Sequence, residues 1–343
     1  MKVARIVVAG CLLLSSSLVA VASDAITQCD TLAASPADTT RPAGIDGVSL
    51  GSVDAAKAIP ACLAAVTEAP KEARLHLQLG RAYEADKADD KAALAYQKAA
   101  ELGSIVGMNN FGVMLDHGRG TAKDETRAVE LYRKAADAGL ARAQVNLGNL
   151  LRDGRGTAKD GAAAFVQFKK AADQGDAEAM YQAGLLLEFG DGIPADIKAA
   201  FTYYKASADN GDVTGTESLA TLLEDGRGTA KDEKAAFAAY KSAIEGGSSW
   251  SKIALAGMLH DGRGTAVDDK TAMTLLREGF SDEQTRTDTL SNGAFYYNEV
   301  TRKAVQDMLK KAGLFNGTVD GVFGPDTNAA IEAFLKLPAP PAN

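Results

Sequence analysis

Apolar residues recur every three or four positions through most of this chain, a spacing that places them on one face of a helix. Two consecutive runs that show it are Ala143, Leu147, Leu151 and Ala164, Phe168, Ala172. Gly154 and Gly156 lie between the runs, and two glycines so close together favour a loop over a helix interior. The pattern therefore predicts two antiparallel helices joined by a glycine loop.

Single residues mark where these helices begin, end and approach one another. Asp160 is placed to cap the second helix, because its carboxylate can accept hydrogen bonds from free backbone N–H groups. Gly175 follows that helix, and glycine suits the left-handed position found after a helix end. Gly148 lies within the first helix. We expect the missing side chain there to let a neighbouring helix come close.

The helix pair repeats with a period of 36 residues and no insertion over five copies. Three series show the period: Gly103, Gly139, Gly175, Gly211, Gly247; the Gly-x-Gly loops beginning at Gly118, Gly154, Gly190, Gly226, Gly262; and Asp124, Asp160, Asp196, Asp232, Asp268. One helix pair cannot bury its apolar stripe alone, so the pairs must stack on their neighbours. The predicted fold class is all-α, an α-solenoid of stacked helix pairs.

The repeated residues resemble the Sel1-like repeats, which are relatives of the tetratricopeptide repeats. Repeat two carries the family pattern as Leu147-Gly148, the glycine loop, Asp160, Ala164, Phe168, Ala171-Ala172 and Gly175. The resemblance covers residues 104–280 and implies a right-handed superhelix that binds another protein. The pattern weakens toward its end, where Ala220 and Ala256 replace the first-helix glycine and Leu276 replaces the aromatic residue.

Residues before the five repeats add two further segments. A shorter unit at 73–103 lacks the glycine loop, resembles a tetratricopeptide unit more closely, and would extend the solenoid to residues 72–280. Residues 23–71 are predicted to form an N-terminal cap. Cys29 and Cys62 lie within it, and a pair of cysteines in an exported chain implies a disulfide. Such a bond would stabilise the fold by roughly 3–4 kcal/mol.

The first 22 residues have the pattern of a cleaved signal peptide. Lys2 and Arg5 precede an apolar run, and Ala20-Val21-Ala22 forms a small-residue cleavage site. An uncleaved membrane anchor and a lipid-modified Cys11 are the alternatives. Cleavage predicts an exported, periplasmic protein of the bacterial envelope with no stable membrane span.

The 36-residue period disappears after residue 281. Residues 281–296 are polar and predict a linker. Two helical runs then follow, at 300–312 and from residue 325 or 326 to 335, with a glycine-rich loop between them. Val305, Leu309 and Ala312 give the first run one apolar side, and Ala330, Ile331 and Phe334 serve the second run. A separate small domain is therefore predicted at 297–343.

This last segment resembles the three-helix peptidoglycan-binding domain of bacterial wall hydrolases. The resemblance rests on Gly313-Leu-Phe315, Gly317, Val319-Asp-Gly-Val-Phe-Gly324 and Thr327, although the usual Phe-Gln near the end is Phe334-Leu335 here. It implies binding to cell-wall glycan or stem peptide. The candidate binding residues are Phe315, Asp320, Gly321, Phe323, Gly324 and Thr327. A retained fold that serves another partner is the alternative, because the glycines and phenylalanines also suit turn and core roles.

Composition and charge exclude several classes of function. Hydrophobic residues make up 46% and charged residues 24% of the chain, as in a soluble folded protein. The formal net charge is −8 and no basic cluster is present, which argues against a nucleic-acid partner. His76, His117 and His260 lie far apart in sequence and predict surface or packing roles. We expect no metal, no cofactor and no catalytic residue, because no metal-ligand spacing, nucleophile motif or phosphate loop is present.

Four arginines occupy equivalent positions in the glycine loops: Arg119, Arg155, Arg227 and Arg263, with Asp191 at this position in the middle repeat. Stacking of the repeats would align them along one edge. Acidic residues just before the loops predict local neutralisation, and docking of an anionic partner along the edge is the alternative.

These features together predict an exported, non-enzymatic scaffold. Its solenoid would bind a protein partner and its C-terminal module would contact peptidoglycan. Two alternatives are a periplasmic regulator that restrains a membrane sensor kinase controlling exopolysaccharide, as in an exported Sel1-like protein of rhizobial type, and a wall-associated accessory to a separate enzyme. In the regulator hypothesis the wall-binding module is incidental.

Overall fold

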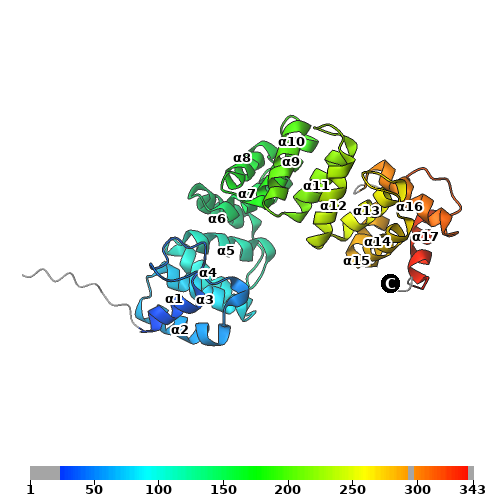
Figure 1. Ribbon diagram of the computed structural model, residues 1–343. Coiled ribbons are helices and arrows are strands. Elements are labelled where there is room, and N and C mark those ends of the chain that lie inside the picture. The colour runs from blue at the N-terminus through cyan, green and yellow to red at the C-terminus, as the bar shows by residue number, and fades with distance from the viewer. Residues whose placement is uncertain (1–23, 293–296, 339–343) are drawn as a thin grey trace, which may run out of the picture. The chain divides into compact units, whose positions relative to one another are not determined.

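The computed structural model describes residues 24–292 and 297–338, and over these residues it contains helices and no strand. The predicted signal peptide at 1–22, including Cys11, lies outside the described residues. Figure 1 labels the helices. They are α1 (Asp24–Ala33), η1 (Leu50–Ser52), α2 (Ala55–Glu68), α3 (Ala73–Ala85), α4 (Asp89–Glu101), α5 (Ile105–His117), α6 (Glu125–Asp137), α7 (Ala141–Asp153), α8 (Gly161–Ala172), α9 (Ala177–Phe189), α10 (Ile197–Asp209), α11 (Val213–Asp225), α12 (Glu233–Glu245), α13 (Ser249–Asp261), α14 (Asp269–Ser281), α15 (Glu283–Asn292), α16 (Glu299–Lys311) and α17 (Pro325–Lys336). The all-α prediction is confirmed.

The chain divides into two compact units, and the division falls within α5 and the loop after it. In the first unit α1, α2 and α3 pack on one another and α3 packs on α4. Leu75 and Leu79 of α3 belong to the same buried cluster as Cys29 and Cys62. The predicted N-terminal cap and the short unit after it therefore share one hydrophobic core.

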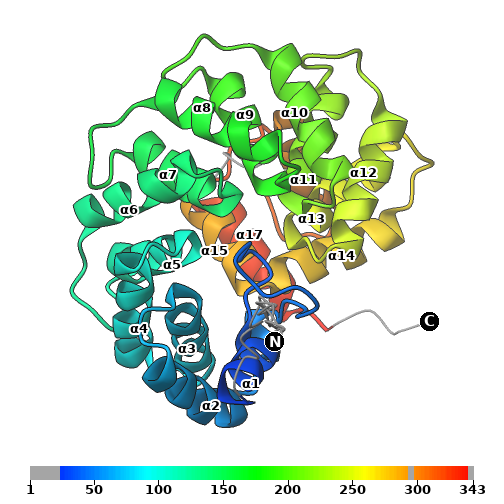
Figure 2. The same ribbon diagram turned by 90° about the vertical axis from the view of Figure 1, so that its left-hand side faces the viewer.

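In the second unit each helix from α6 to α14 packs on the next one along the chain. Figure 2 shows the odd-numbered helices α7, α9, α11 and α13 as an inner row and the even-numbered helices as an outer row. α9 also contacts α11 directly, so these two helices of the inner row lie side by side. Consecutive stacking of this kind is what an α-solenoid requires.

The residues of repeat two that were predicted to cap a helix, to end a helix and to allow close packing have these roles in the structure. The aspartate before every second helix accepts a hydrogen bond from a backbone N–H of the first turn: Asp124, Asp160, Asp196, Asp232 and Asp268. Gly175 has a φ of +91°. A Cβ on Gly148 would lie 2.6 Å from Cε1 of Phe168, so the ring of the second helix packs directly on the backbone of the first.

The stretch predicted to be a linker is helical over most of its length. Asp282 accepts a hydrogen bond from the backbone N–H of Thr285 and caps α15. Thr285 and Thr289 are buried, and the guanidinium of Arg286 donates to the carbonyl of Phe280. The segment reads as a linker because residues 281–292 are mostly polar, but capping by Asp282, burial of the two threonines and packing of Leu290 against the core accompany this helix.

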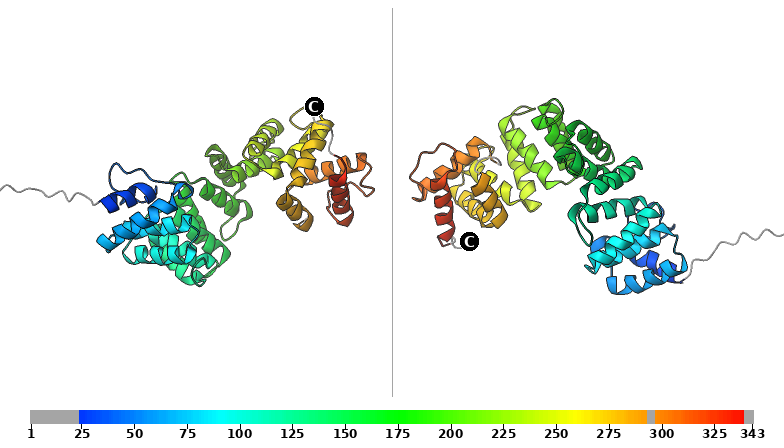
Figure 3. Two further views of the ribbon diagram at one scale, coloured as in Figure 1. Left: turned by 90° about the horizontal axis from the view of Figure 1, so that it is seen from below. Right: turned by 180° about the vertical axis from the view of Figure 1, so that it is seen from behind.

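The C-terminal module packs against the last repeat. α16 contacts α13 and α17 contacts α14, as Figure 3 shows from two further directions, with the module in orange and red beside the yellow repeat. Arg277 of α14 lies 4.6 Å from the ring centroid of Phe334 and donates to the carbonyl of the same residue at 2.9 Å. Leu276 and Leu309 fall in one buried cluster. The module and the final repeats thus share one continuous core.

Candidate functional site

A single glutamine organises the turn that carries the peptidoglycan-binding signature. Gln306 on α16 is buried, and its side-chain oxygen accepts hydrogen bonds from the backbone N–H groups of Asp320 and Gly321, at 2.9 and 2.7 Å. Its amide nitrogen donates to the Asp320 carboxylate and to the carbonyl of Val322. The backbone N–H of Val322 donates to that carboxylate as well. These donors hold the pKa of Asp320 below its usual range.

The predicted wall-binding residues are mostly inside the module. Phe315, Phe323 and Thr327 are buried. Gly321 has a φ of +79°, a left-handed conformation that favours glycine. The residues that gave the recognisable signature therefore build the turn, whereas Val322 between them is 64% exposed. Asp320 and Val322 are the exposed residues of the turn at 320–324, and sequence reasoning did not select Val322.

The loop arginines form ion pairs that connect adjacent repeats. Arg155 lies 2.8 Å from Asp116, Arg227 lies 2.8 Å from Glu188, Arg119 contacts Glu84 and Asp89, and Arg263 contacts Glu224. Arg155, Arg227 and Arg263 thus meet an acid in the first helix of the preceding repeat, whereas the shortest contact of Arg119 is with Asp89 in the second helix of the preceding unit. Acidic residues of the same repeat make additional contacts with these arginines. Arg263, for example, lies 3.0 Å from Asp261. Docking of an anionic partner on this row stays a prediction, although the row's charges are already paired.

In several repeats, the acid that pairs with a loop arginine also accepts a hydrogen bond from a tyrosine of the second helix. The hydroxyl groups donate as follows: Tyr96 to Glu84, Tyr204 to Glu188 and Tyr240 to Glu224. Repeat two differs at all three corresponding positions, with Phe168 in place of tyrosine, Arg152 in place of the acid and Asp191 in place of the next loop arginine. The acid is thus absent where the tyrosine hydroxyl is absent. We infer that these triads stabilise the stacking of repeats.

The histidines occupy unrelated surroundings. His76 contacts the carbonyl of Pro70, and the side chain of His117 is 60% exposed. His260 is buried between Asp269 and Asp307, where it joins α13 to α14 and α16. Within residues 24–292 and 297–338, no group of histidine, cysteine, aspartate and glutamate side chains is arranged to hold a metal ion.

The inner row of the second unit contains a pocket of about 330 Å³. α11 lines it with Thr214, Glu217, Ser218 and Thr221, and α13 adds Trp250 and Ser251. Tyr181 of α9, Tyr240 of α12 and Tyr297 before α16 complete most of the wall. Sequence reasoning missed this pocket because each of its residues looks ordinary within its own repeat.

A comparison between repeats could have located it. The α11 positions Thr214, Ser218 and Thr221 correspond to Glu178, Gln182 and Leu185 one repeat earlier. Glu217 corresponds to Tyr181 on one side and Ile253 on the other. Small polar side chains at three neighbouring positions leave space, and a carboxylate stands where the two adjacent repeats place a tyrosine and an isoleucine.

Two family models match the sequence. The "Sel1 repeat" model matches residues 76–104, 105–140, 141–176, 177–212 and 218–248. The short unit, predicted to be closer to a tetratricopeptide unit, thus matches the Sel1 repeat itself, while the last helix pair, α13 and α14, lies beyond the matched ranges. The "Putative peptidoglycan binding domain" model matches residues 298–334.

Two solved structures share the fold over most of the chain. One is a protective antigen of uropathogenic Escherichia coli strains with an SLR fold, at TM-score 0.62 and 22% identity, covering 78% of this chain and 58% of that one. This chain therefore spans little more than half of the antigen's length. The other is a Sel1 repeat protein from Oxalobacter formigenes, at TM-score 0.59 and 23% identity, covering 76% and 98%. No curated protein matches this chain in sequence.

Proposed function

This chain is a Sel1 repeat protein with a C-terminal domain of the peptidoglycan-binding family, and we propose that it is an exported, non-enzymatic scaffold of the bacterial envelope. Its repeats bind another protein through the inner row of helices, and its C-terminal module contacts peptidoglycan. No helix among residues 24–292 and 297–338 is long and apolar enough to cross a membrane.

The observation that carries this proposal is the common core of the last repeats and the C-terminal module. Arg277 donates to three carbonyl groups at the end of α17, those of Phe334, Leu335 and Leu337. A module on a flexible tether would only tie the repeats to the wall. A module packed into the last repeat presents the inner row in a defined direction when it contacts the wall.

Wall contact is tested by sedimentation with purified peptidoglycan sacculi. Because the module shares its core with the repeats, deleting it would expose apolar surface, and a surface substitution is the cleaner test. We expect Val322→Glu to reduce the sedimented fraction by about tenfold, since it places a charge on the exposed signature turn. Val267→Glu is the matched control, because Val267 is 60% exposed in the last repeat loop.

Two results would contradict wall contact through the signature turn. If neither the unsubstituted protein nor the control sediments, the module does not bind the wall, and a free periplasmic regulator becomes the better account. If both variants sediment like the unsubstituted protein, a different surface makes the contact.

Protein binding by the inner row is tested by site-specific photo-crosslinking in the intact envelope. A photoreactive residue at Glu178 on α9 should give one discrete adduct whose protein component is identified by mass spectrometry. The same residue at Lys241, exposed on the outer helix α12, should give none. Equal adducts from both positions, or none from either, would contradict a partner on the inner row.

A further inference from the structure

The pocket on the inner row has walls of aromatic rings and one carboxylate. Its volume of about 330 Å³ falls at the lower end of the range for ligand pockets, roughly 300–1,000 Å³. Such a volume suits one long side chain or one small ring better than a large cofactor. The walls come from three repeats and from the start of the C-terminal module, so the pocket exists only in the assembled second unit.

Aromatic rings form a large part of the wall. The ring centroids of Trp250 and Tyr297 lie 5.3 Å apart with the planes inclined by 40°. Tyr181 and Tyr240 add two further rings from α9 and α12. Faces of aromatic rings attract cations, and tryptophan does so most strongly. Rings of this kind also stack well on a flat guanidinium group.

Glu217 supplies a negative charge that no side chain of the described residues neutralises. The hydroxyl groups of Ser248 and Ser251 both donate to its Oε1 atom. None of the described residues donates to Oε2, and no lysine, arginine or histidine lines the pocket. In contrast, the half-buried Glu188 and the buried Glu224 each have an arginine partner. Burial raises the pKa of the Glu217 carboxyl group, and nearby Asp212 raises it further.

Two other acidic side chains near the pocket carry a negative charge, as Glu217 does. Asp225, at the end of α11, accepts a hydrogen bond from the amide of Asn298, which itself lines the pocket. Asp212 caps α11. These acidic side chains favour a cation over an anionic ligand in the pocket.

We propose that this pocket binds the side chain of an arginine presented by a basic segment of a partner protein. The guanidinium lies against the rings of Trp250 and Tyr297 and donates to the carboxylate of Glu217. The inference rests on the proposed function, because it names the chemistry by which the inner row recognises its partner. A neutral sugar ring is the competing occupant, and the experiment below separates the two.

Tryptophan fluorescence reports on this pocket alone, because Trp250 is the only tryptophan in the chain. The full mature protein is titrated with a synthetic Gly-Arg-Gly-Arg-Gly peptide, with the same peptide carrying neutral citrulline in place of arginine, and with a chitotetraose sugar. We expect saturable quenching by the arginine peptide, weakened at least tenfold by citrulline and reduced by added salt.

Glu217→Gln should weaken arginine-peptide binding by about tenfold or more, because it removes the charge and keeps an oxygen for the two serine hydroxyls. Its unfolding midpoint should stay the same or rise, since a half-buried charge without a cationic partner costs stability. Glu245→Gln, on the exposed end of α12, is the matched control and should bind like the unsubstituted protein.

Three outcomes would overturn the inference. Equal binding of arginine and citrulline peptides would remove the role of charge. Unchanged binding by Glu217→Gln would remove the role of that residue. Quenching by the sugar alone would assign the pocket to a glycan. None of these results bears on wall contact or on crosslinking from Glu178, which lies outside the pocket, so the pocket can fail while the scaffold proposal stands.

Discussion

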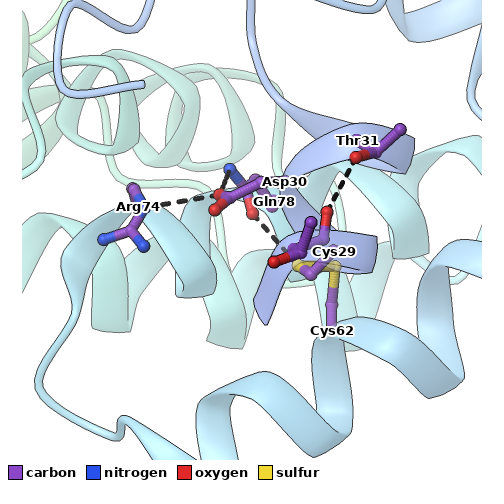
Figure 4. Close-up of a disulfide and its surroundings, with 7 residues drawn as sticks. Cys29, Asp30, Thr31, Cys62, Arg74 and Gln78 are labelled. Atoms are coloured by element: carbon purple, nitrogen blue, oxygen red, sulfur yellow. Dashed lines mark hydrogen bonds and ion pairs between the residues drawn. A yellow bond between two sulfur atoms is a disulfide. The ribbon is translucent and has the colours of Figure 1, made fainter. Parts of the chain in front are cut away.

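Replacement of Cys29 and Cys62 together by alanine lowers the free energy of unfolding of the first unit by about 2–5 kcal/mol. The structure joins the two cysteines by a disulfide with a Cα–Cα distance of 4.7 Å and a sequence separation of 33 residues. Figure 4 shows the bond linking the first helix to the second. Both sulfur-bearing side chains are fully buried, so the substitution also removes packing.

Beside the shared hydrophobic core, polar contacts also join α1 to α3. The amide of Gln78 donates to the Asp30 carboxylate at 2.7 Å, and Arg74 contacts the same carboxylate at 3.3 Å. These groups, drawn in Figure 4, are satisfied only while α1 stays docked. We therefore expect loss of the disulfide to expose the Asp30 carboxylate and the Gln78 amide, together with the end of the solenoid.

Urea denaturation followed by circular dichroism measures the effect. Tryptophan fluorescence does not report it, because Trp250 lies in the second unit. Reduction of the unsubstituted protein with dithiothreitol should give a similar loss and serves as the control. Identical urea midpoints for oxidised, reduced and substituted proteins would show that the bond adds nothing to stability.

Arg263→Ala should destabilise the second unit by about 3–5 kcal/mol, the cost of leaving a buried charge without its partner. The side chains of Arg263 and Glu224 are only 11% and 3% exposed. Tyr240 shares the same carboxylate, so the arginine, the acid and the tyrosine are lost as one network. Urea denaturation followed by Trp250 fluorescence is the measurement, since this residue lies on the affected helix α13.

The loop arginine of repeat four provides a matched control for this prediction. The side chain of Arg227 is 46% exposed and pairs with Glu188, so Arg227→Ala should cost only about 1 kcal/mol. Glu224→Gln added to Arg263→Ala should recover part of the stability, because it removes the unpaired charge. Equal losses from Arg227→Ala and Arg263→Ala would show that burial does not govern the strength of these pairs.

The helices and their repeat were predictable because their causes are local. Asp160 caps its helix through a backbone N–H three residues later, and the left-handed φ of Gly175 concerns one residue. The 36-residue period then follows from repetition of the same local signals. The wall-binding signature was recognisable for a similar reason, since Gln306 and the turn at Asp320 lie close together in the chain.

Other features depended on contacts that cross repeats. The partner of Arg155 is Asp116, 39 residues away, rather than the acid two residues before it. The linker prediction was wrong over α15 because burial of Thr285 and Thr289 depends on the surrounding helices. No pattern within one repeat indicates that the C-terminal module shares a core with the helices before it.

The sequence by itself determined the class of fold, the helix ends, the repeat and the two families, because each depends on residue types at fixed spacings along the chain. Only the tertiary structure decided which arginine meets which acid, that the signature residues are buried in their own turn, and that Glu217 faces a pocket with no cation. The physical reason is that burial and pairing are set by the neighbours that stacking brings together. Those neighbours come from α9, α11, α13 and α16, which are far apart in the chain.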